Sequence, residues 1–234
     1  RALCATGRLC VDGRYPREAI GTRNLMQFDL EAVGTQNAYK LLAATVMPRP
    51  IAWVVTESAE GGCNAAPYSF FNVMGSAPPT IALGLLADPK RGFKDTARNI
   101  LDNGEFVVNL VPERLVDAMN LTSIDAPRGL DELQLAGLMT APSVRVRPPR
   151  IAASPVAFEC VSLSSIVTGP NQVVVIGRVI VVHIDDDCVL DAERAHVDTP
   201  KLDLVARSYG SDYVRSRDTF SLARPSWSER RDRK

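Results

Sequence analysis

The feature that most constrains the fold is a pair of long, β-branched runs in the second half of the chain. Residues 158–169 read FECVSLSSIVTG and residues 172–185 read QVVVIGRVIVVHID, with Gly169, Pro170 and Asn171 at the junction. β-Branched residues favour strands, and a Gly-Pro-Asn break favours a tight turn. The two runs therefore predict a long β-hairpin.

The second of these runs is apolar in both of its alternating phases. One phase holds Val173, Val175, Val179 and Val181, and the other holds Val174, Ile176, Ile180, Val182 and Ile184. A strand that buries both faces needs cover on both sides. We therefore expect a β-barrel whose outer wall is covered by helices or by a second subunit.

The rest of the chain predicts more strands than helices. Strands are expected at 51–56, 80–87 and 105–111, and the stretch 61–72 should be a further strand after a turn at Gly61 and Gly62. Helices are expected at 37–44, 94–103, 112–123 and 130–138. Asp95 or Thr96 should cap the second helix, and Gly104 should end it. The fold class is mainly β with peripheral helices.

Composition excludes several classes of function. Lys plus Arg equals Asp plus Glu at 27 each and the pI is about 6.9, so no global charge would attract nucleic acid or an anionic membrane. The apolar runs are too short to be membrane-spanning helices. Five scattered cysteines and two histidines support neither a disulfide framework nor a metal site, and a cytoplasmic location is expected.

The two ends of the chain differ in character from its middle. Residues 1–26 contain arginines but no apolar core of a secretory signal, and residues 226–234 are mostly charged. We expect a flexible N-terminal tail at 1–26 and a charged C-terminal tail at 226–234. One domain should occupy residues 27–225.

Two segments could bind an anion or a carbonyl-rich ring. Lys94 directly precedes a helix start that also carries the Thr96 hydroxyl, which suits a phosphate. The alternative is that Asp95 or Thr96 only caps the helix and Lys94 is solvated. Arg49 is held between Pro48 and Pro50 and could face a ring or a phosphate, but the segment could equally be a helix stop followed by an edge strand.

Other candidates are open to ordinary structural explanations. Asn64, Ala65 and Ala66 could expose backbone N–H groups to a ring, or they could belong to a hairpin with core aromatics. His183 precedes an Asp-rich turn, where a hydrogen bond at the strand end is a better interpretation than a metal site. Cys63 is interpreted as a small buried residue. No pair of side chains suggests acid–base catalysis.

Six segments, in order, resemble the flavin reductase-like, FMN-binding split-barrel family that includes the flavoredoxins. They are PRPIAWVVT, NAAPYSFFN, SAPP, KDTARNI with GEFVVNLV, SPVAFEC, and KLDLVARSYGSDYVR, within about Phe28 to Pro225. The resemblance implies a split β-barrel, a homodimer, and FMN held non-covalently in a cleft near the subunit interface.

The resemblance also implies a set of cofactor-binding residues. Lys94, Asp95 and Thr96 would hold the phosphate end of FMN, and residues 49–51 and 64–69 would border the ring and the ribityl chain, while Arg207 matches the family's late motif. The full set is Arg49, Pro50, Ile51, Asn64, Ala65, Ala66, Pro67, Tyr68, Ser69, Lys94, Asp95, Thr96 and Arg207. The chain departs from the family at Tyr209, where a glycine is common. A tyrosine ring there would narrow the entrance for the nicotinamide or the substrate.

The implied activity is that of a flavin oxidoreductase. A flavin reductase would transfer hydride from NADH or NADPH to FMN and supply reduced flavin to a partner monooxygenase. The alternatives are a flavoredoxin-like electron-transfer protein that retains FMN and serves a redox-protein partner, and a flavin-binding protein without turnover. The flavin carries the chemistry in this scheme, so no catalytic side chain and no metal is expected.

Overall fold

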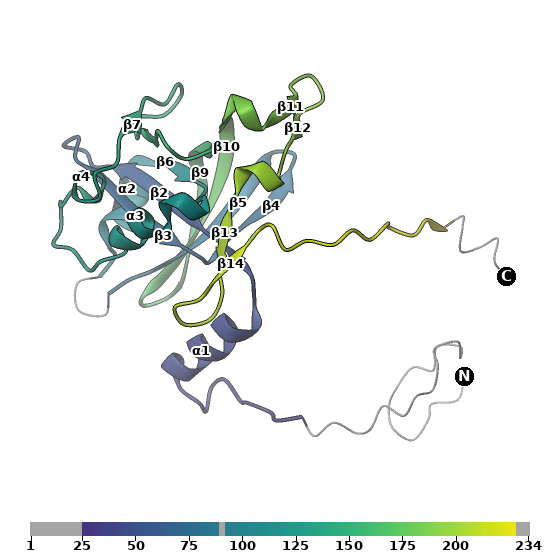
Figure 1. The fold of residues 1–234 in the computed structure, drawn as a ribbon. Helices are drawn as coiled ribbons and strands as arrows, with labels where there is room; N and C mark the ends of the chain where they lie inside the picture. Colours follow the sequence, from purple (N-terminus) through teal and green to yellow (C-terminus); the bar gives the residue numbers. More distant parts are fainter. Residues whose placement is uncertain (1–24, 89–91, 228–234) are drawn as a thin grey trace. The chain divides into compact units, whose positions relative to one another are not determined.

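The computed structural model describes residues 25–88 and 92–227 (Figure 1). The chain divides into two units, residues 1–41 and 42–234. Most of the expected tails, at 1–24 and 228–234, lies outside the described residues, as do residues 89–91. Within the described part, none of the helices combines the length and the apolar character needed to cross a membrane.

The second unit contains a seven-stranded antiparallel sheet with the order β3-β2-β6-β9-β10-β5-β4. Its strands are β2 (Ala52–Glu57), β3 (Cys63–Tyr68), β4 (Phe71–Ser76), β5 (Pro79–Leu86), β6 (Glu105–Asn109), β9 (Val156–Gly169) and β10 (Gln172–Ile184). The predicted hairpin is confirmed, because β9 and β10 pair along their length and Gln172 lies opposite Gly169. The mainly β fold with peripheral helices is also confirmed.

The first and last strands of the sheet are neighbours in sequence. Only Ser69 and Phe70 separate β3 from β4, so the stretch 61–72 is two strands with a bend and not the single strand expected. The Phe70 carbonyl accepts a hydrogen bond from the Gly84 N–H of β5 at 2.7 Å. A Cβ on Gly84 would lie 2.9 Å from the Phe70 Cβ, so this close approach requires glycine. The curled sheet therefore brings its two edges to one place, as a split barrel does.

The core lies on both sides of the central strands. In β2, Ala52 and Val54 pack into one buried cluster, while Trp53 and Val55 pack into a second. This double burial was expected for β10, but there only Val173 and Val175 are buried among its apolar side chains, and the others are partly or largely exposed, with Val182 51% exposed. The strands buried on both faces are therefore central β2 and β6, whose outer face is covered by short helices and loops.

Three small sheets and six short helical segments surround the barrel. The sheets pair β1 (Arg49–Pro50) with β13 (Val205–Arg207) and β14 (Tyr213–Arg215), β7 (Thr140–Ala141) with β8 (Arg150–Ile151), and β11 (Val189–Asp191) with β12 (His196–Val197). The helical segments are α2 (Asp95–Asn103), α3 (Val116–Leu121), α4 (Glu132–Leu135), η1 (Glu113–Leu115), η2 (Asp186–Cys188) and η3 (Pro200–Leu202). Helix α1 spans Thr35–Thr45.

Helix α2 ends as expected but begins differently. Gly104 adopts the left-handed conformation (φ 73°) at its C-terminus, which confirms the predicted stop. The N-cap residue is Lys94, and its side chain makes no capping hydrogen bond, so the prediction of a cap at Asp95 or Thr96 is wrong. Both side chains instead bind other segments, and the first turn of α2 is left without a side-chain cap.

Candidate functional site

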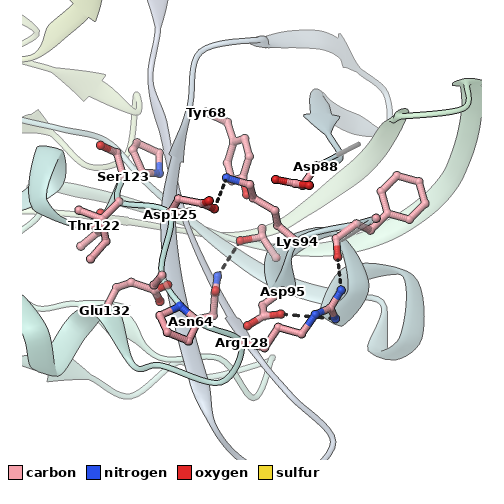
Figure 2. A pocket seen from close by; sticks show the side chains of 18 residues that line it. Asn64, Tyr68, Asp88, Lys94, Asp95, Thr122, Ser123, Asp125, Arg128 and Glu132 are labelled. Carbon is pink, nitrogen blue, oxygen red and sulfur yellow. Dashed lines mark hydrogen bonds and ion pairs between the residues drawn. The ribbon is translucent and has the colours of Figure 1, made fainter. Parts of the chain in front are cut away.

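A polar pocket of about 130 Å³ lies between β3, the start of α2 and the loop 122–128 (Figure 2). It is called the polar pocket below. Helix α4 adds one side chain to its wall, that of Glu132. The pocket brings together seven of the thirteen expected cofactor-binding residues: Asn64, Ala66, Pro67, Tyr68, Lys94, Asp95 and Thr96.

Buried hydrogen bonds fix the inner wall of the polar pocket. The Asn64 side-chain amide donates to the Thr96 hydroxyl at 2.6 Å, which joins β3 to α2, and Thr96 is only 1% exposed. Burial raises the pKa of Tyr68 to about 12 and outweighs the lowering effect of the Thr96 hydrogen bond, while the charge of Glu132 adds a smaller upward contribution. The phenol of Tyr68 therefore stays neutral at physiological pH and can donate a hydrogen bond.

Ion pairs tie the loop 122–128 to the start of α2. The Lys94 ammonium lies 3.3 Å from an Asp125 carboxylate oxygen, and both side chains are about half exposed. A guanidinium nitrogen of Arg128 lies 3.9 Å from Asp95, and the other Asp95 oxygen accepts from the Gly129 N–H at 2.9 Å. Because these pairs are in contact with solvent, each contributes little stability and can exchange partners.

Among the described residues that line it, the polar pocket carries more negative than positive groups. Its lining includes four carboxylates, on Asp88, Asp95, Asp125 and Glu132, and two cations, Lys94 and Arg128. Glu132 is buried at 7% exposure and accepts from the Ala65 N–H at 3.0 Å. Burial raises its pKa despite that hydrogen bond, and the charge of Asp95 raises it further.

The pocket offers several groups that suit a polar, anionic ligand. The uncapped first turn of α2 presents backbone N–H groups, and Lys94 provides a positive charge beside it. The amide of Asn64 and the hydroxyls of Ser123 and Tyr68 line the same space. This donor set fits a phosphate next to Lys94 and a chain of hydroxyl groups along β3.

A second cavity, of about 500 Å³, is bordered by residues 48–50, 69–72, 84–86 and 172–174. It is called the apolar groove below. Three expected residues, Arg49, Pro50 and Ser69, line it and do not line the polar pocket. The sequence therefore identified residues of two separate cavities as one set.

Arg49 is buried in the wall of this groove and has a structural role. It is 7% exposed, and its Nη1 donates to the carbonyls of Ala43 and Val46 while Nη2 donates to the Ser208 carbonyl at 2.7 Å. These bonds join the end of α1 to the turn after β13. Its Nε–H is buried and has no hydrogen-bond partner among the described residues.

The remaining expected residues lie elsewhere. Ile51 borders a third cavity with Leu110 and Val205, and Ala65 is fully buried in the core. Arg207 stacks over Tyr213 with 4.7 Å from its guanidinium carbon to the ring centroid, and it donates to the Gly210 carbonyl. None of the three lines the polar pocket or the apolar groove.

Sequence reasoning missed the loop between α3 and α4. Ser123, Asp125 and Arg128 line the polar pocket, and Glu132 follows them on α4. One signal was available, because TSIDAPR is a polar, Pro-containing connection between two expected helices, and such loops often carry function. Its proximity to α2 depends on contacts over more than 30 residues, which local patterns do not reveal.

His183 and Cys63 were the other candidate residues considered from the sequence. His183 Nε2 lies 2.6 Å from an oxygen of fully buried Glu159, as expected for a histidine held by a hydrogen bond. Burial alone would raise the pKa of Glu159, but the N–H groups of Val144 and Arg145 and the His183 contact lower it overall. Cys63 is only partly buried and not the buried residue expected, and this partial burial raises the pKa of its thiol. Among residues 25–88 and 92–227, no group of three or more His, Cys, Asp or Glu residues could hold a metal ion.

Comparisons with known proteins agree with this fold. The chain is 46% identical over 207 residues to a protein of Deinococcus radiodurans, a match that covers 86% of this chain and 91% of the relative. Nitrilotriacetate monooxygenase component B from Bacillus cereus has a solved structure that superposes with a TM-score of 0.81 at 29% identity, covering 86% of this chain and 100% of that chain.

A second solved structure is also similar over most of its length. Pseudomonas fluorescens 2-nitrobenzoate 2-nitroreductase NbaA gives a TM-score of 0.78 at 32% identity, covering 86% of this chain and 98% of that chain. The expected split barrel is confirmed by solved structures of this fold. The sequence profile of the flavin reductase like domain matches residues 44–198. The chain therefore belongs to the flavin reductase-like family.

Proposed function

We propose that this protein binds FMN in the polar pocket and acts as a flavin reductase that oxidises NADH or NADPH. The observation that carries the proposal is the uncapped start of α2, where Lys94 and buried Thr96 border the pocket. Helix N-termini bind phosphate through their backbone N–H groups and their dipole. Membership of the flavin reductase-like family supports a flavin as the ligand.

The residues of the polar pocket fit FMN in three respects. Lys94 and the first turn of α2 would hold the phosphate, whose charge would compete with Asp125 for the lysine. Asn64, Ser123 and Tyr68 provide polar groups for the ribityl hydroxyls. Ala66 and Pro67 provide small, apolar surface for the ring. The expected contacts from Arg49, Pro50, Ile51, Ala65, Ser69 and Arg207 remain predictions.

The bound flavin would accept a hydride from the nicotinamide and pass the electrons on, so the protein has mainly to bind and orient it. The 122–128 loop, held to α2 by Arg128 and Lys94, would close one side of the pocket. Neutral Tyr68 would donate a hydrogen bond without adding charge. We assign no acid or base role to any side chain.

Further parts of the proposal concern assembly and context. The FMN-binding domain would comprise residues 27–225 and form a homodimer in the cytoplasm. One solved relative is component B of a monooxygenase, which favours a partner monooxygenase that uses reduced flavin. A flavoredoxin-like electron carrier that retains FMN is the competing function.

The test is to purify the full chain, add FMN, and measure the visible absorbance of the protein after removal of free flavin. A flavin spectrum is expected, and anaerobic addition of NADH or NADPH should bleach it. Protein that neither retains nor takes up FMN would contradict the proposal. Bound FMN that neither nicotinamide reduces at a useful rate would favour the electron carrier.

A further inference from the structure

We propose that the apolar groove is a separate binding site for a small, apolar monocarboxylate, such as an aromatic acid, whose carboxylate is bound by Arg49. The groove has a volume of about 500 Å³. Pockets of several hundred Å³ are typical for small organic ligands. The groove is therefore large enough for a ring with one polar substituent.

The charge of the groove defines the polar end of this ligand. Arg49 is the only charged residue among the described residues that line it, and it is 7% exposed. A buried cation is unfavourable unless its hydrogen bonds and its charge are both compensated. Three backbone carbonyls engage its Nη groups, but they carry no full negative charge, and the buried Nε–H has no partner among the described residues. A carboxylate in the groove would compensate the charge, and a small shift of the Arg49 side chain would bring the buried Nε–H to it.

The walls of the groove define the rest of the ligand. Phe70, Phe71 and Leu86 supply apolar surface, and the polar side chains at the groove, such as Asn72 and Gln172, are neutral. A phosphate dianion or a sugar-like chain would lose hydration against such walls without enough partners. A single carboxylate on an apolar body matches one cation in an apolar cavity.

The polar pocket and the groove therefore select different ligands. Four carboxylates line the polar pocket and would repel a second anion, whereas the described lining of the groove contains none. Benzoate can be titrated into the chain without added FMN, so the groove can be tested whether or not the polar pocket takes FMN.

The test uses the full chain with benzoate as the probe and benzamide as its neutral, nearly isosteric control. Titration is followed by NMR at the arginine Nε–H signals, where the signal of Arg49 is assigned by its loss in Arg49→Lys. Benzoate should shift the Arg49 signal and bind about tenfold or more tightly than benzamide, because only the acid forms a charge-assisted hydrogen bond.

Two substitutions on β10 separate the groove from a general surface effect. Val174 lines the groove directly opposite Gly84, so Val174→Phe should fill the space and weaken benzoate by about tenfold or more. Val182 lies on the same strand, is 51% exposed and does not line the groove, so Val182→Phe should leave the affinity unchanged. This pair decides the question even where Arg49→Lys fails to fold, because both variants keep Arg49 and its hydrogen bonds.

Three results would overturn the proposal. They are equal affinity for benzoate and benzamide, unchanged benzoate affinity in Val174→Phe, and competitive displacement of benzoate by FMN. The last result would place the flavin ring in the groove. A protein that binds benzoate at Arg49 but no FMN would retain this inference and refute only the flavin proposal.

Discussion

The polar pocket and the apolar groove place cations in opposite environments. In the pocket, Lys94 is about half exposed and pairs with an equally exposed Asp125. In the groove, Arg49 is buried and fixed by three backbone carbonyls. An exposed pair contributes little to stability but can open for a ligand, whereas the buried guanidinium holds the fold and has two N–H groups left, one on Nε and one on Nη2. The difference shows how one chain can keep a solvent-exposed, exchangeable cation in one cavity and a buried, fixed cation in another.

The largest expected effect is on the free energy of unfolding, when the cation of each cavity is replaced by methionine. Arg49→Met removes three hydrogen bonds from a charged group and should lower the free energy of unfolding by about 3 kcal/mol or more. Lys94→Met removes one exposed ion pair and should change it by less than about 1 kcal/mol. Urea denaturation of both variants measures the difference. Similar losses would show that the two cations do not differ in structural role.

The affinity for FMN, unlike the stability, should depend strongly on Lys94. Lys94→Met is expected to weaken FMN by about tenfold or more, because a charge-assisted contact to the phosphate is lost. The matched control is Arg98→Met, since Arg98 is an exposed cation on α2 that does not line the polar pocket. Quenching of flavin fluorescence gives both dissociation constants. The assignment of the phosphate end fails where the two variants bind FMN equally well.

A smaller effect on the affinity for FMN should appear when Asp125, the partner of Lys94, is neutralised. Asp125→Asn removes the carboxylate that competes with a phosphate for this lysine, so FMN should bind tighter by an amount below about 1 kcal/mol. The gain should decrease at high salt, which screens exposed charges. Asp117→Asn, an exposed site on α3 outside the pocket, is the control. Weaker FMN binding in Asp125→Asn would mean that Asp125 contacts the ligand directly.

The smallest expected effect is a dependence of the free energy of unfolding on pH. Burial raises the pKa of Glu132 above its value in the unfolded chain, so its contribution to stability is greatest at low pH and is lost as pH rises through the folded pKa. Glu132→Gln keeps a carbonyl oxygen for the Ala65 N–H and should gain stability relative to the parent protein as pH increases. Urea denaturation across the acidic to neutral range, with exposed Glu193→Gln as control, measures this trend. Parallel curves for the parent and Glu132→Gln would contradict it.

Local patterns predicted the parts of the fold that depend on neighbouring residues. The hairpin of β9 and β10 follows from β-branched runs and one turn, and the end of α2 follows from Gly104. The start of α2 was predicted wrongly because Asp95 bonds to Gly129 and Thr96 to Asn64, both about 30 residues distant. Long-range partners outcompeted the local cap.

The candidate site was predictable in residue type but not in arrangement. Asn64, Lys94 and Thr96 were identified from local patterns and then supported by the family resemblance, and the structure places them around one pocket. Arg49 was identified in the same way, but the structure places it in another cavity. Sequence order gave no sign of this separation, because the curl of the sheet and the bend at 69–70 decide which side of the barrel each residue faces.

The two-residue link between β3 and β4 gives the cavities a common mechanical element. Tyr68 borders the polar pocket and Ser69, the next residue, borders the apolar groove. A ligand that shifts the backbone at one of them changes the energy of the other through a single peptide bond. Thermodynamic linkage then requires that the first ligand alter the affinity of the second by the same factor as the second alters the first.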